Sequence, residues 1–429
     1  MDFLVRCSGN TFCYHTKRCQ RAVSSVLSAN GLLPRQLNVV QRRSCASGPY
    51  IVRESAKRRP MERRKIVMPE FVEQRLNKLQ MEIVTSLLEQ SPLGSMASAT
   101  ASSSTEEGAK DSTKSSFSAN LERMAKYYFN QGGKLFRPKI SLLMANACNQ
   151  MAPLNVRTRN LPDGDHVSLN QYRIAVVAEM IHTASLVHDD VIDKSDVRRG
   201  EPTVNALWGN KMAVLVGDFI LARATQVLCS IGRPNVISIM AEIIEDLVRG
   251  EFMQMSTSAT SKIDGRTLFK QYMAKTFNKT ASLFANSCKS VAVLSDAGED
   301  VEHRAYEYGR HLGLAFQLVD DLLDFESSAE ILGKPAANDL KLGLATGPVL
   351  YAAQEYPELN PLISRRFSEP GDTETALEII RNSKGLERTR ELARQHCYSA
   401  ANLVCEMPNG NGASDMLVEL ALSQLDRNS

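Results

Sequence analysis

The sequence predicts an all-α fold, a single large helical bundle around a central cavity. Apolar residues recur at intervals of three and four over most of the chain after residue 170, which is the spacing of one helix face. Alternating Val, Ile and Thr runs between hairpin turns, which would indicate strands, are scarce. Two aspartate-rich motifs also lie in apolar helical surroundings and are expected to face a shared interior. The long apolar-periodic segments are residues 170–192, 212–231, 235–254, 267–295 and 301–326.

Residues 1–65 are expected to be a mitochondrial transit peptide and basic leader, ahead of one folded domain over residues 66–429. Residues 1–60 hold eleven Lys and Arg, and their acids are Asp2 and Glu54. An acid-poor leader with Arg and Ser is typical of mitochondrial targeting. The alternative is a basic tail that binds nucleic acid or membrane nonspecifically.

The composition suits a large core and excludes several classes of site. Hydrophobic residues make up 43% of the 429 positions. The nine cysteines form no C-x-x-C pair, so neither a disulfide framework nor a zinc site is indicated. The most apolar run, residues 212–222, is interrupted by Asp218. We therefore expect a soluble or peripheral protein and no membrane-spanning helix.

The segments before the first aspartate motif alternate between helix and polar insert. Residues 70–91 are predicted to be a helix that Pro92 ends. Residues 95–118 contain nine Ser and are predicted to form a mobile insert, with helix resuming near Ala119. A second polar insert is expected at about residues 152–168.

The two aspartate motifs share the pattern Asp-Asp-x-x-Asp. Residues four apart lie one turn apart on a helix, so each motif projects at least two carboxylates in one direction. Clustered carboxylates resist burial unless a cation lies between them. Magnesium is bound by carboxylates together with substrate phosphates, so the motifs predict a Mg²⁺–diphosphate site. The candidate metal ligands are Asp189, Asp190, Asp193, Asp320, Asp321 and Asp324.

Cations accompany the first motif. Arg198 and Arg199 follow it, and two adjacent arginines there are suited to clamp diphosphate oxygens. Upstream, Lys134 and Arg137 lie in the sequence Gly-Gly-Lys-Leu-Phe-Arg-Pro. Glycines bring the backbone close to a ligand, and cations three residues apart on a helix are expected to reach one phosphate.

Cations and polar groups also surround the second motif. Lys275-Thr276 and Lys279-Thr280 repeat at four residues, which places both lysines on one predicted helix face. Gln317 precedes the motif and Lys334 follows it. Solvated lysines are the alternative for this pattern.

One histidine is expected to lie on the same helix face as the first motif's carboxylates. His182 precedes Asp189 by seven residues, two helical turns, and so shares its face. His188 is adjacent to Asp189 and points elsewhere. The alternative for His182 is an ordinary packed core histidine.

In chain order, the motifs GGKxxRP, DDxxD, RRG, KT, FQLxDDxxD and GKPxxxDL resemble those of the trans-isoprenyl diphosphate synthases. The similarity runs from about Ala119 to the C-terminus. Residues 339–348 are similar to the mitochondrial long-chain branch, which makes decaprenyl or solanesyl diphosphate for the ubiquinone tail. The resemblance implies an isoprenoid synthase-type bundle and a prenyltransferase. Such an enzyme elongates farnesyl or geranylgeranyl diphosphate with isopentenyl diphosphate.

The resemblance also implies residue roles. The six aspartates would hold two or three Mg²⁺ ions on the allylic diphosphate, and Asp189, Asp190, Asp193, Lys279, Asp320 and Asp321 would be catalytic. The allylic substrate would contact Arg198, Lys279, Thr280, Gln317 and Lys334. Isopentenyl diphosphate would contact Lys134, Arg137, His182 and Arg199.

The chain departs from the family pattern at two positions, where Leu135 and Leu344 stand in place of cations. Product length is expected to depend on Ala184 and Ser185, five and four residues before Asp189. Bulky side chains there would plug the cavity, so two small residues predict a long product.

Several alternatives stay open. A shorter-chain geranylgeranyl synthase is the nearest, and a subunit active only with a paralogous partner is another. A class I terpene cyclase would not need a second Asp-Asp-x-x-Asp motif, and a noncatalytic regulatory subunit should have eroded motifs. We expect a homodimer or a heteromer in the mitochondrial matrix, associated with the inner membrane. Its membrane contact would be peripheral, for product release, and no nucleic-acid partner is expected.

Overall fold

The computed structural model describes residues 67–88, 111–130, 133–161, 165–256, 265–330 and 337–427. Residues Lys65–Ser429 form one compact unit. The leader, the insert residues 95–110 and Lys334 lie outside the described residues.

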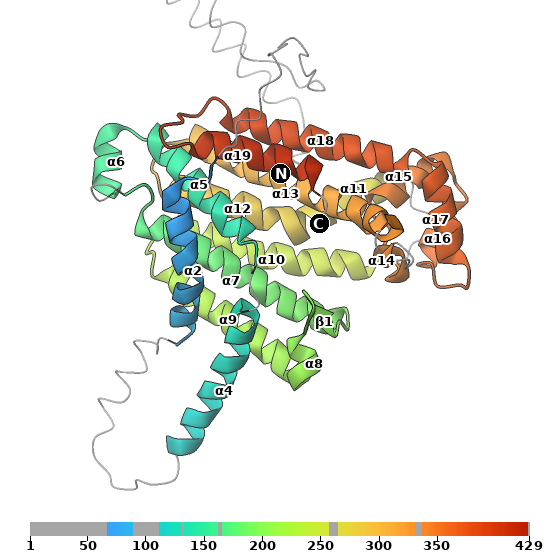
Figure 1. Cartoon of the computed structure of the whole chain (residues 1–429), viewed down its shortest axis with the longest axis horizontal. Helices are drawn as coiled ribbons and strands as arrows, with labels where there is room; N and C mark the ends of the chain where they lie inside the picture. The colour runs from blue at the N-terminus through green and yellow to red at the C-terminus, as the bar shows by residue number, and fades with distance from the viewer. Residues whose placement is uncertain are drawn as a thin grey trace, which may run out of the picture. The chain divides into compact units, whose positions relative to one another are not determined.

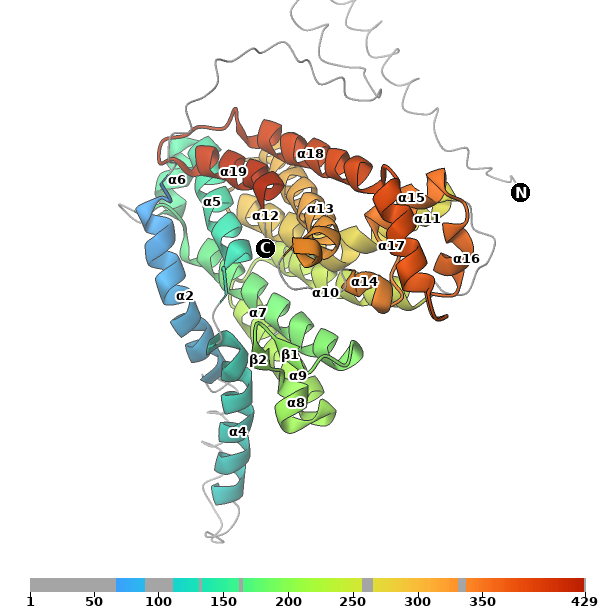
Figure 2. The same ribbon diagram turned by 45° about the vertical axis from the view of Figure 1, so that its right-hand side comes forward.

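The all-α prediction is confirmed, since helices account for nearly all regular structure in the described residues (Figures 1 and 2). Up to the first motif they are α2 (Glu70–Leu88), α4 (Asp111–Asn130), α5 (Phe136–Met151), α6 (Leu154–Asn160) and α7 (Leu169–Ile192). Between the motifs lie α8 (Val204–Trp208), α9 (Asn210–Cys229), α10 (Pro234–Ser256), α11 (Gly265–Thr276), the π-helix η2 (Phe277–Ala281) and α12 (Ser282–Val293). The second motif lies on α13 (Glu299–Glu330). It is followed by α14 (Asn338–Lys341), α15 (Gly347–Glu355), α16 (Leu359–Ser364), α17 (Asp372–Asn382), α18 (Gly385–Val404), α19 (Ala413–Leu422) and the 3₁₀-helix η3 (Ser423–Asp426).

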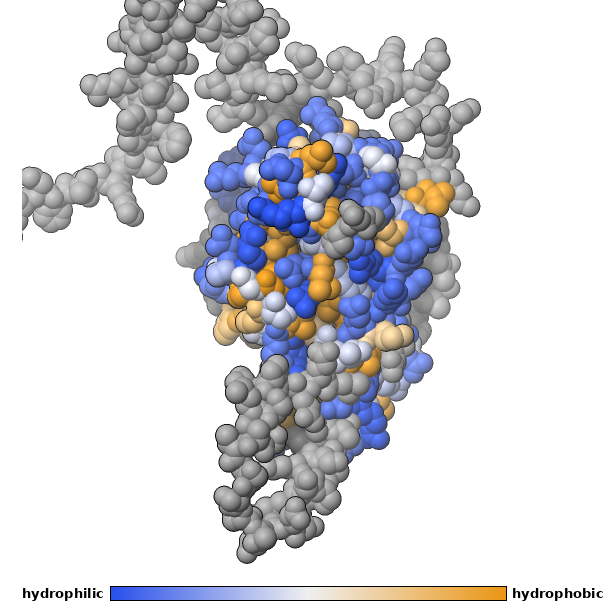
Figure 3. Space-filling model, turned by 90° about the vertical axis from the view of Figure 1, so that its left-hand side faces the viewer, coloured by the Kyte–Doolittle hydropathy of each residue, from blue (hydrophilic) through white to orange (hydrophobic). Residues whose placement is uncertain are grey.

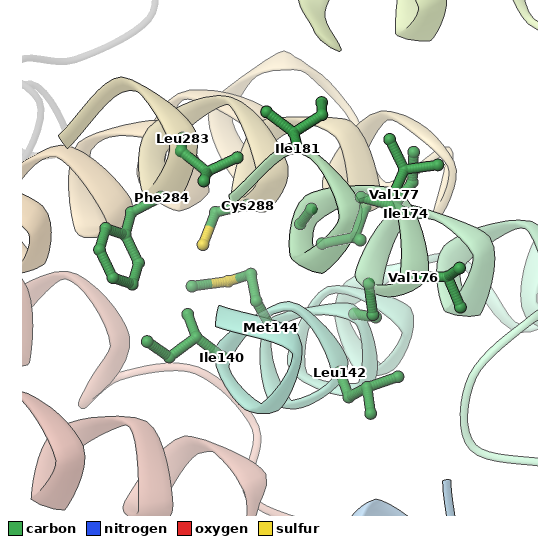
Figure 4. Close-up of a cluster of buried hydrophobic side chains, with 14 of the residues drawn as sticks. Ile140, Leu142, Met144, Ile174, Val176, Val177, Ile181, Leu283, Phe284 and Cys288 are labelled. Carbon is green, nitrogen blue, oxygen red and sulfur yellow. The ribbon is translucent and has the colours of Figure 1, made fainter. Parts of the chain in front are cut away.

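The core lies where α5, α7 and α12 meet. Figure 4 shows Ile140 and Met144 of α5 pointing toward Phe284 and Cys288 of α12, and all four side chains are buried. Each large apolar side chain buried in this way contributes about 1.5–3 kcal/mol. Helix α7 therefore enters the site from a rigid core that fixes its axis.

Two glycines bring α13 against α12 and the π-helix. A Cβ at Gly309 would lie 2.5 Å from the backbone oxygen of Phe284, and one at Gly313 would lie 2.5 Å from Cα of Ala281. The helices approach this closely only because both positions lack a side chain. This contact places the second motif beside Lys279 and Thr280 of η2.

The two polar inserts contain more helix than the sequence predicts. Residues 111–118, predicted as part of the mobile insert, belong to α4, and α6 lies within the second polar insert. Adding residues to an existing helix gains one hydrogen bond for each residue fixed. A polar stretch can therefore extend a helix without an apolar pattern that reveals it.

The predicted segment 267–295 is helical, but a π-turn interrupts it at Phe277–Ala281. A two-stranded antiparallel ribbon also follows the first motif, with β1 (Val197–Arg198) paired to β2 (Glu201–Pro202). Its two-residue turn, Arg199–Gly200, has positive φ at both positions (55° and 84°), as a type I′ hairpin requires.

Helix α9 presents apolar residues to the surface. Of the described helices, it alone has the length and composition of a membrane span, and 33% of its apolar window is buried. It packs on α7 through Gly217, where a Cβ would lie 2.1 Å from Nε2 of His188. Leu215 is 50% exposed. On the face seen in Figure 3, hydrophobic residues occur in small groups among hydrophilic ones.

Candidate active site

The first aspartate motif lies at the C-terminal end of α7. A capping box at Ser168 and Gln171 starts this helix, and Asp193 ends it. Asp189 is half-buried and Asp193 is exposed, one turn apart as predicted. Burial raises the pKa of Asp189 to about 6; Glu251 and Asp193 add to the rise, whereas Lys279 and Arg198 oppose it. A carboxylate with its pKa raised in this way is one that a cation would stabilise.

Asp190 points away from that pair, because adjacent helix residues are about 100° apart. It is fully buried and accepts hydrogen bonds from the hydroxyl of Tyr128 and from Nε of Arg198, the latter at 2.8 Å. Asp190 therefore fastens α7 to α4 and to the ribbon that follows the motif.

The second motif repeats this arrangement on α13. Asp321 is buried and accepts hydrogen bonds from the Tyr272 hydroxyl at 2.5 Å and from Nε2 of Gln317 at 3.0 Å. Thr280 Oγ1 donates to Oε1 of Gln317 at 2.8 Å. The hydrogen bonds therefore link η2, α13 and α11, and they bring together Thr280 and Gln317, which the sequence assigned to one substrate.

The other two carboxylates of this motif, Asp320 and Asp324, lie one helical turn apart. Asp324 accepts hydrogen bonds from the backbone N–H groups of Asn338 (3.1 Å) and Asp339 (2.9 Å), so it caps the short helix α14. Asp320 accepts one from Nη2 of Arg427. Burial raises the pKa of Asp320, and Arg427 opposes that rise.

Arg427 is a site residue that the sequence reasoning missed. It follows η3, and its guanidinium carbon lies 4.2 Å from the centroid of the Phe316 ring. The C-terminal segment thereby reaches a candidate metal ligand 107 residues earlier in the chain. An arginine near a chain end carries no motif, so periodicity and spacing give no signal for it.

Lys275 and Lys279 lie four residues apart, on α11 and on the π-helix η2, and burial together with the charge of Lys279 lowers the pKa of Lys275. The π-turn between them adds a residue to one helical turn and rotates the helix. Lys279 forms an ion pair with Glu251 of α10. Burial lowers the pKa of Lys279, but Asp189, Glu251 and Asp193 outweigh that effect and raise it. Asp321, Asp339 and Glu251 oppose the fall in the pKa of Lys275 that burial causes.

Gly250 explains the position of Lys279. A Cβ at Gly250 would lie 3.1 Å from the backbone nitrogen of Lys279, which is tighter than ordinary contact. The missing side chain lets α10 approach η2, and it places Glu251 beside the Lys279 ammonium. Glu251 has no motif of its own, and the sequence reasoning did not find it.

Arg198 and Arg199 contact different neighbours, and the clamp expected of them on a diphosphate stays a prediction. Arg198 binds Asp190, while a Cβ at Gly133 would lie 3.2 Å from Nη1 of Arg199. Gly133 gives the Arg199 guanidinium the space to lie against the backbone.

Arg137, His182 and Arg199 lie together around a buried acid, Glu179, which the sequence reasoning missed. Burial raises the pKa of Glu179, and Arg137 and Arg199 oppose the rise. Burial also lowers the pKa of His182 well below its usual value, and Arg137, Arg199 and Arg198 lower it further. His182 is therefore neutral at physiological pH.

Arg137 retains an unused donor. Its Nε is buried and makes no hydrogen bond within the described part of the chain. Its guanidinium carbon lies 4.8 Å from the centroid of the Phe284 ring, and burial lowers its pKa to about 10. Buried donors are nearly always paired, so an anionic ligand fits this position. Lys134 is exposed beside it.

The donor set fits Mg²⁺ bound together with a ligand. Among the described residues, no three His, Cys, Asp or Glu side chains converge on a closed metal site. Magnesium does not need such a site, since it keeps several waters and binds through one or two carboxylates plus phosphates. Asp189 with Asp193, and Asp320 with Asp324, provide such pairs.

The two candidate chain-length residues lie one turn before the first motif. Ala184 is fully buried. Ser185 is half-buried, and its Oγ donates a 2.8 Å hydrogen bond to the backbone oxygen of His182. Of the two departures from the expected cations, Leu135 adopts a left-handed conformation before α5 (φ 44°), and Leu344 lines a small cavity with Lys275 and Tyr272.

Comparison with known proteins extends these observations. The family model for polyprenyl synthetase matches residues 118–380. The all-trans-polyprenyl-diphosphate synthase of Homo sapiens is 49% identical over 309 residues, which are 72% of this chain and 71% of that protein. The mitochondrial solanesyl-diphosphate synthase 1 of Oryza sativa is 43% identical, over 68% of this chain and 67% of that protein.

Solved structures show the same fold. The heptaprenyl diphosphate synthase of Staphylococcus aureus superimposes with a TM-score of 0.67 at 28% identity, covering 83% of this chain and 99% of that one. A decaprenyl diphosphate synthase from Rhodobacter capsulatus gives a TM-score of 0.66 at 26% identity, covering 83% and 97%.

Proposed function

The chain belongs to the polyprenyl synthetase family and is a prenyltransferase, and we propose that it extends farnesyl or geranylgeranyl diphosphate with successive isopentenyl diphosphate units. The product is a long all-trans polyprenyl diphosphate, the side-chain precursor of ubiquinone. The observation that carries this proposal is the pair of matching motifs. In each, the middle aspartate is anchored by a tyrosine, while the first and third lie one turn apart on one helix face.

The residues of the two motifs divide into ligands and supports. Asp189, Asp193, Asp320 and Asp324 would hold Mg²⁺, two or three ions, on the allylic diphosphate. Bound there, the metal supplies Lewis-acid stabilisation of the departing diphosphate. Asp190 and Asp321 belong to the same metal site. Their part in it is to hold the two motif helices in the orientation that turns the other four aspartates toward the metal.

The cations of this site stabilise the same leaving group. Lys279 lies beside Asp189 and Asp193, and Arg198, Thr280 and Gln317 lie next to the motifs. Lys334 is assigned with them from the sequence. Preorganised donors and charges are most effective where negative charge develops, here on the diphosphate as the carbon–oxygen bond breaks.

The second substrate occupies the arginine cluster. Lys134, Arg137, His182 and Arg199 would bind the diphosphate of isopentenyl diphosphate, and the unpaired Nε of Arg137 supports this assignment. Neutral His182 is a hydrogen-bonding group that adds no charge. Holding both substrates in one orientation replaces a bimolecular encounter with an intramolecular step.

The reaction joins the substrates at carbon. The allylic carbon–oxygen bond breaks, and both electrons leave with the diphosphate. The double bond of isopentenyl diphosphate then attacks the allylic cation, and the proton lost from the adduct passes to the released diphosphate. The product is one isoprene unit longer and is itself an allylic diphosphate. Small residues at 184 and 185 leave room for it to grow.

The names of relatives support a mitochondrial location for the enzyme. Relatives from rice and from Neurospora crassa are named as mitochondrial, and the basic leader supports the same compartment. We place the enzyme in the matrix, in peripheral contact with the inner membrane during product release. It would act as a homodimer or as a heteromer with a paralogous subunit.

The test is direct. Purified protein is incubated with Mg²⁺, isopentenyl diphosphate and farnesyl or geranylgeranyl diphosphate, alone and with a paralogous subunit, and products are sized by mass spectrometry. We expect long all-trans products and no turnover in Asp189→Ala. Products that stop at geranylgeranyl diphosphate would favour the shorter-chain alternative. Near-normal turnover in Asp189→Ala would overturn the metal assignment.

A further inference from the structure

Lys275 is a partly buried cation without an ion-pair partner. It lies on α11, four residues before Lys279, and is half-buried. Within the described ranges its ammonium reaches no carboxylate at ion-pair distance, and it lies 5.8 Å from the centroid of the Tyr272 ring. A desolvated ammonium is unfavourable unless an anion compensates it. Its position therefore suggests a ligand.

One neighbouring carboxylate, that of Asp321, is already engaged. Asp321 accepts hydrogen bonds from Tyr272 and Gln317, so its oxygens are satisfied without Lys275. Burial lowers the pKa of Lys275, and Asp321 and Asp339 oppose the fall. An additional anion close to the Lys275 ammonium would oppose this fall in its pKa further.

A second cationic side chain, that of Arg366, lines the cavity beside Lys275, and its hydrogen bonds are already made to the backbone. The cavity has a volume of about 50 Å³, and its lining includes Lys275, Tyr272, Leu344 and Arg366. The Arg366 guanidinium donates to the backbone oxygens of Gln254 (3.3 Å) and Met255 (2.8 Å), which closes the C-terminal end of α10. Leu344 brings no charge, so Lys275 supplies the uncommitted positive charge on this wall.

We propose that Lys275 is a further substrate-binding residue, whose ammonium binds a phosphate oxygen of the allylic diphosphate from the side of the second motif. Lys279 reaches the same diphosphate from the side of the first motif, where it faces Asp189 and Asp193. This assignment rests on the proposed function, because the diphosphate is that of the allylic substrate. Lys279 lies four residues further along the chain and contributes to the lowered pKa of Lys275, after burial, so the two ammonium groups are near enough to share one anionic ligand.

The competing explanation is electrostatic support, in which Lys275 only offsets the charge of Asp321 and Asp339. Three variants separate the two. Lys275→Gln removes the charge, Lys275→Arg keeps it, and Lys270→Gln removes an exposed charge from the same helix. Binding of inorganic pyrophosphate in the presence of Mg²⁺ is measured by isothermal titration calorimetry on the full chain. Steady-state kinetics follow with farnesyl and isopentenyl diphosphate.

A charge-assisted hydrogen bond contributes about 1.5–3 kcal/mol, which is roughly a 10- to 100-fold change in affinity. We expect Lys275→Gln to weaken pyrophosphate binding, and to raise the KM for farnesyl diphosphate, by about that factor. Its KM for isopentenyl diphosphate should stay near that of the wild type. Lys275→Arg should retain most of the affinity, and Lys270→Gln should match the wild type.

Unchanged pyrophosphate affinity in Lys275→Gln would overturn the proposal, whatever the variant does to thermal stability. If Lys275→Gln unfolds, Lys275→Met removes the charge while keeping a side chain of similar length, and unchanged pyrophosphate affinity in that variant would count against the proposal. The titration needs no turnover. The wild type could also bind pyrophosphate through Lys275 and yet catalyse no prenyl transfer. That result would refute the proposed function but would still support an anion-binding site at Lys275.

Discussion

The Tyr272 hydroxyl donates a 2.5 Å hydrogen bond to the Asp321 carboxylate. Tyr128 makes the corresponding bond to Asp190 in the first motif. Each tyrosine comes from another helix, so the bond fixes the rotation of the motif helix about its own axis. The first and third aspartates of each motif are thereby held toward the site.

Tyr272→Phe removes this anchor and leaves the ring in place. Loss of a hydrogen bond to a buried carboxylate corresponds to about 1.5–3 kcal/mol, so we expect prenyl transfer to fall about 10- to 100-fold. The apparent affinity for Mg²⁺ should weaken together with kcat. Activity would be measured over a Mg²⁺ titration. Tyr398→Phe, at a tyrosine that is 47% exposed on α18, is the control. Wild-type behaviour of Tyr272→Phe would show that Asp321 needs no anchor.

The sequence was sufficient to predict how the first and third aspartates of each motif are arranged, but not what the middle aspartate contacts. The spacing of Asp189 and Asp193 fixes their shared face whatever surrounds them, because helix geometry is local. The partner of Asp190 comes from α4, 62 residues earlier, and no local pattern specifies such a pairing. Glu179, Glu251 and Arg427 were missed for the same reason, since each is defined by a neighbour from a distant segment.

Arg427 competes with a metal for Asp320. The guanidinium binds the carboxylate that Mg²⁺ would need and also stacks on Phe316. In Arg427→Gln we expect the affinity for Mg²⁺ without substrate to rise about 3- to 10-fold, since a partly exposed pair contributes up to about 1 kcal/mol. Calorimetry at pH 8 keeps proton competition small.

Arg390→Gln is the matched control for that measurement. It removes an arginine that pairs with Glu326 on the exposed side of α13, and Mg²⁺ affinity should not change. A weaker or unaltered affinity in Arg427→Gln would mean that the arginine assists the site and does not block it.

His311 and His396 give the fold an acid-sensitive contact between α13 and α18. Their Nδ1 atoms are 2.8 Å apart, with Glu307 and Arg310 beside them. Burial lowers the pKa of His311 to about 4 and that of His396 to about 3. The unfolded chain therefore binds protons first as the pH falls below 6.5, and the free energy of unfolding declines from there toward pH 4.

His396→Gln should reduce this decline by on the order of 2 kcal/mol between pH 7 and pH 4. Urea unfolding at several pH values measures it. His303→Gln, exposed on the same helix, should follow the wild-type curve. Parallel curves for His396→Gln and the wild type would exclude the pair as a source of acid sensitivity.

The fold was more predictable than its local irregularities. Long apolar periods require helices that pack on one another, and α7, α9, α10 and α13 lie within a few residues of the expected ranges. The π-turn at Phe277–Ala281 was not predictable, because apolar periodicity does not distinguish one π-turn from an α-helical turn.

Ser185 offers the clearest test of product length. Ala184 is fully buried, so a large residue there would also disrupt packing, which typically costs about 1–3 kcal/mol. Ser185 is only half-buried and tolerates bulk better. Ser185→Phe should shift the longest product to fewer isoprene units while condensation continues, because the ring fills space that the growing chain needs. Mass spectrometry of the products measures the shift.

Ser185→Ala is its control. It removes the 2.8 Å hydrogen bond to His182 but keeps the side chain small, so product length should not change. If Ser185→Ala shortened the product as much as Ser185→Phe, the hydrogen bond and not the bulk would set the length. If neither variant altered the product distribution, the chain would grow along a path that this turn of α7 does not border.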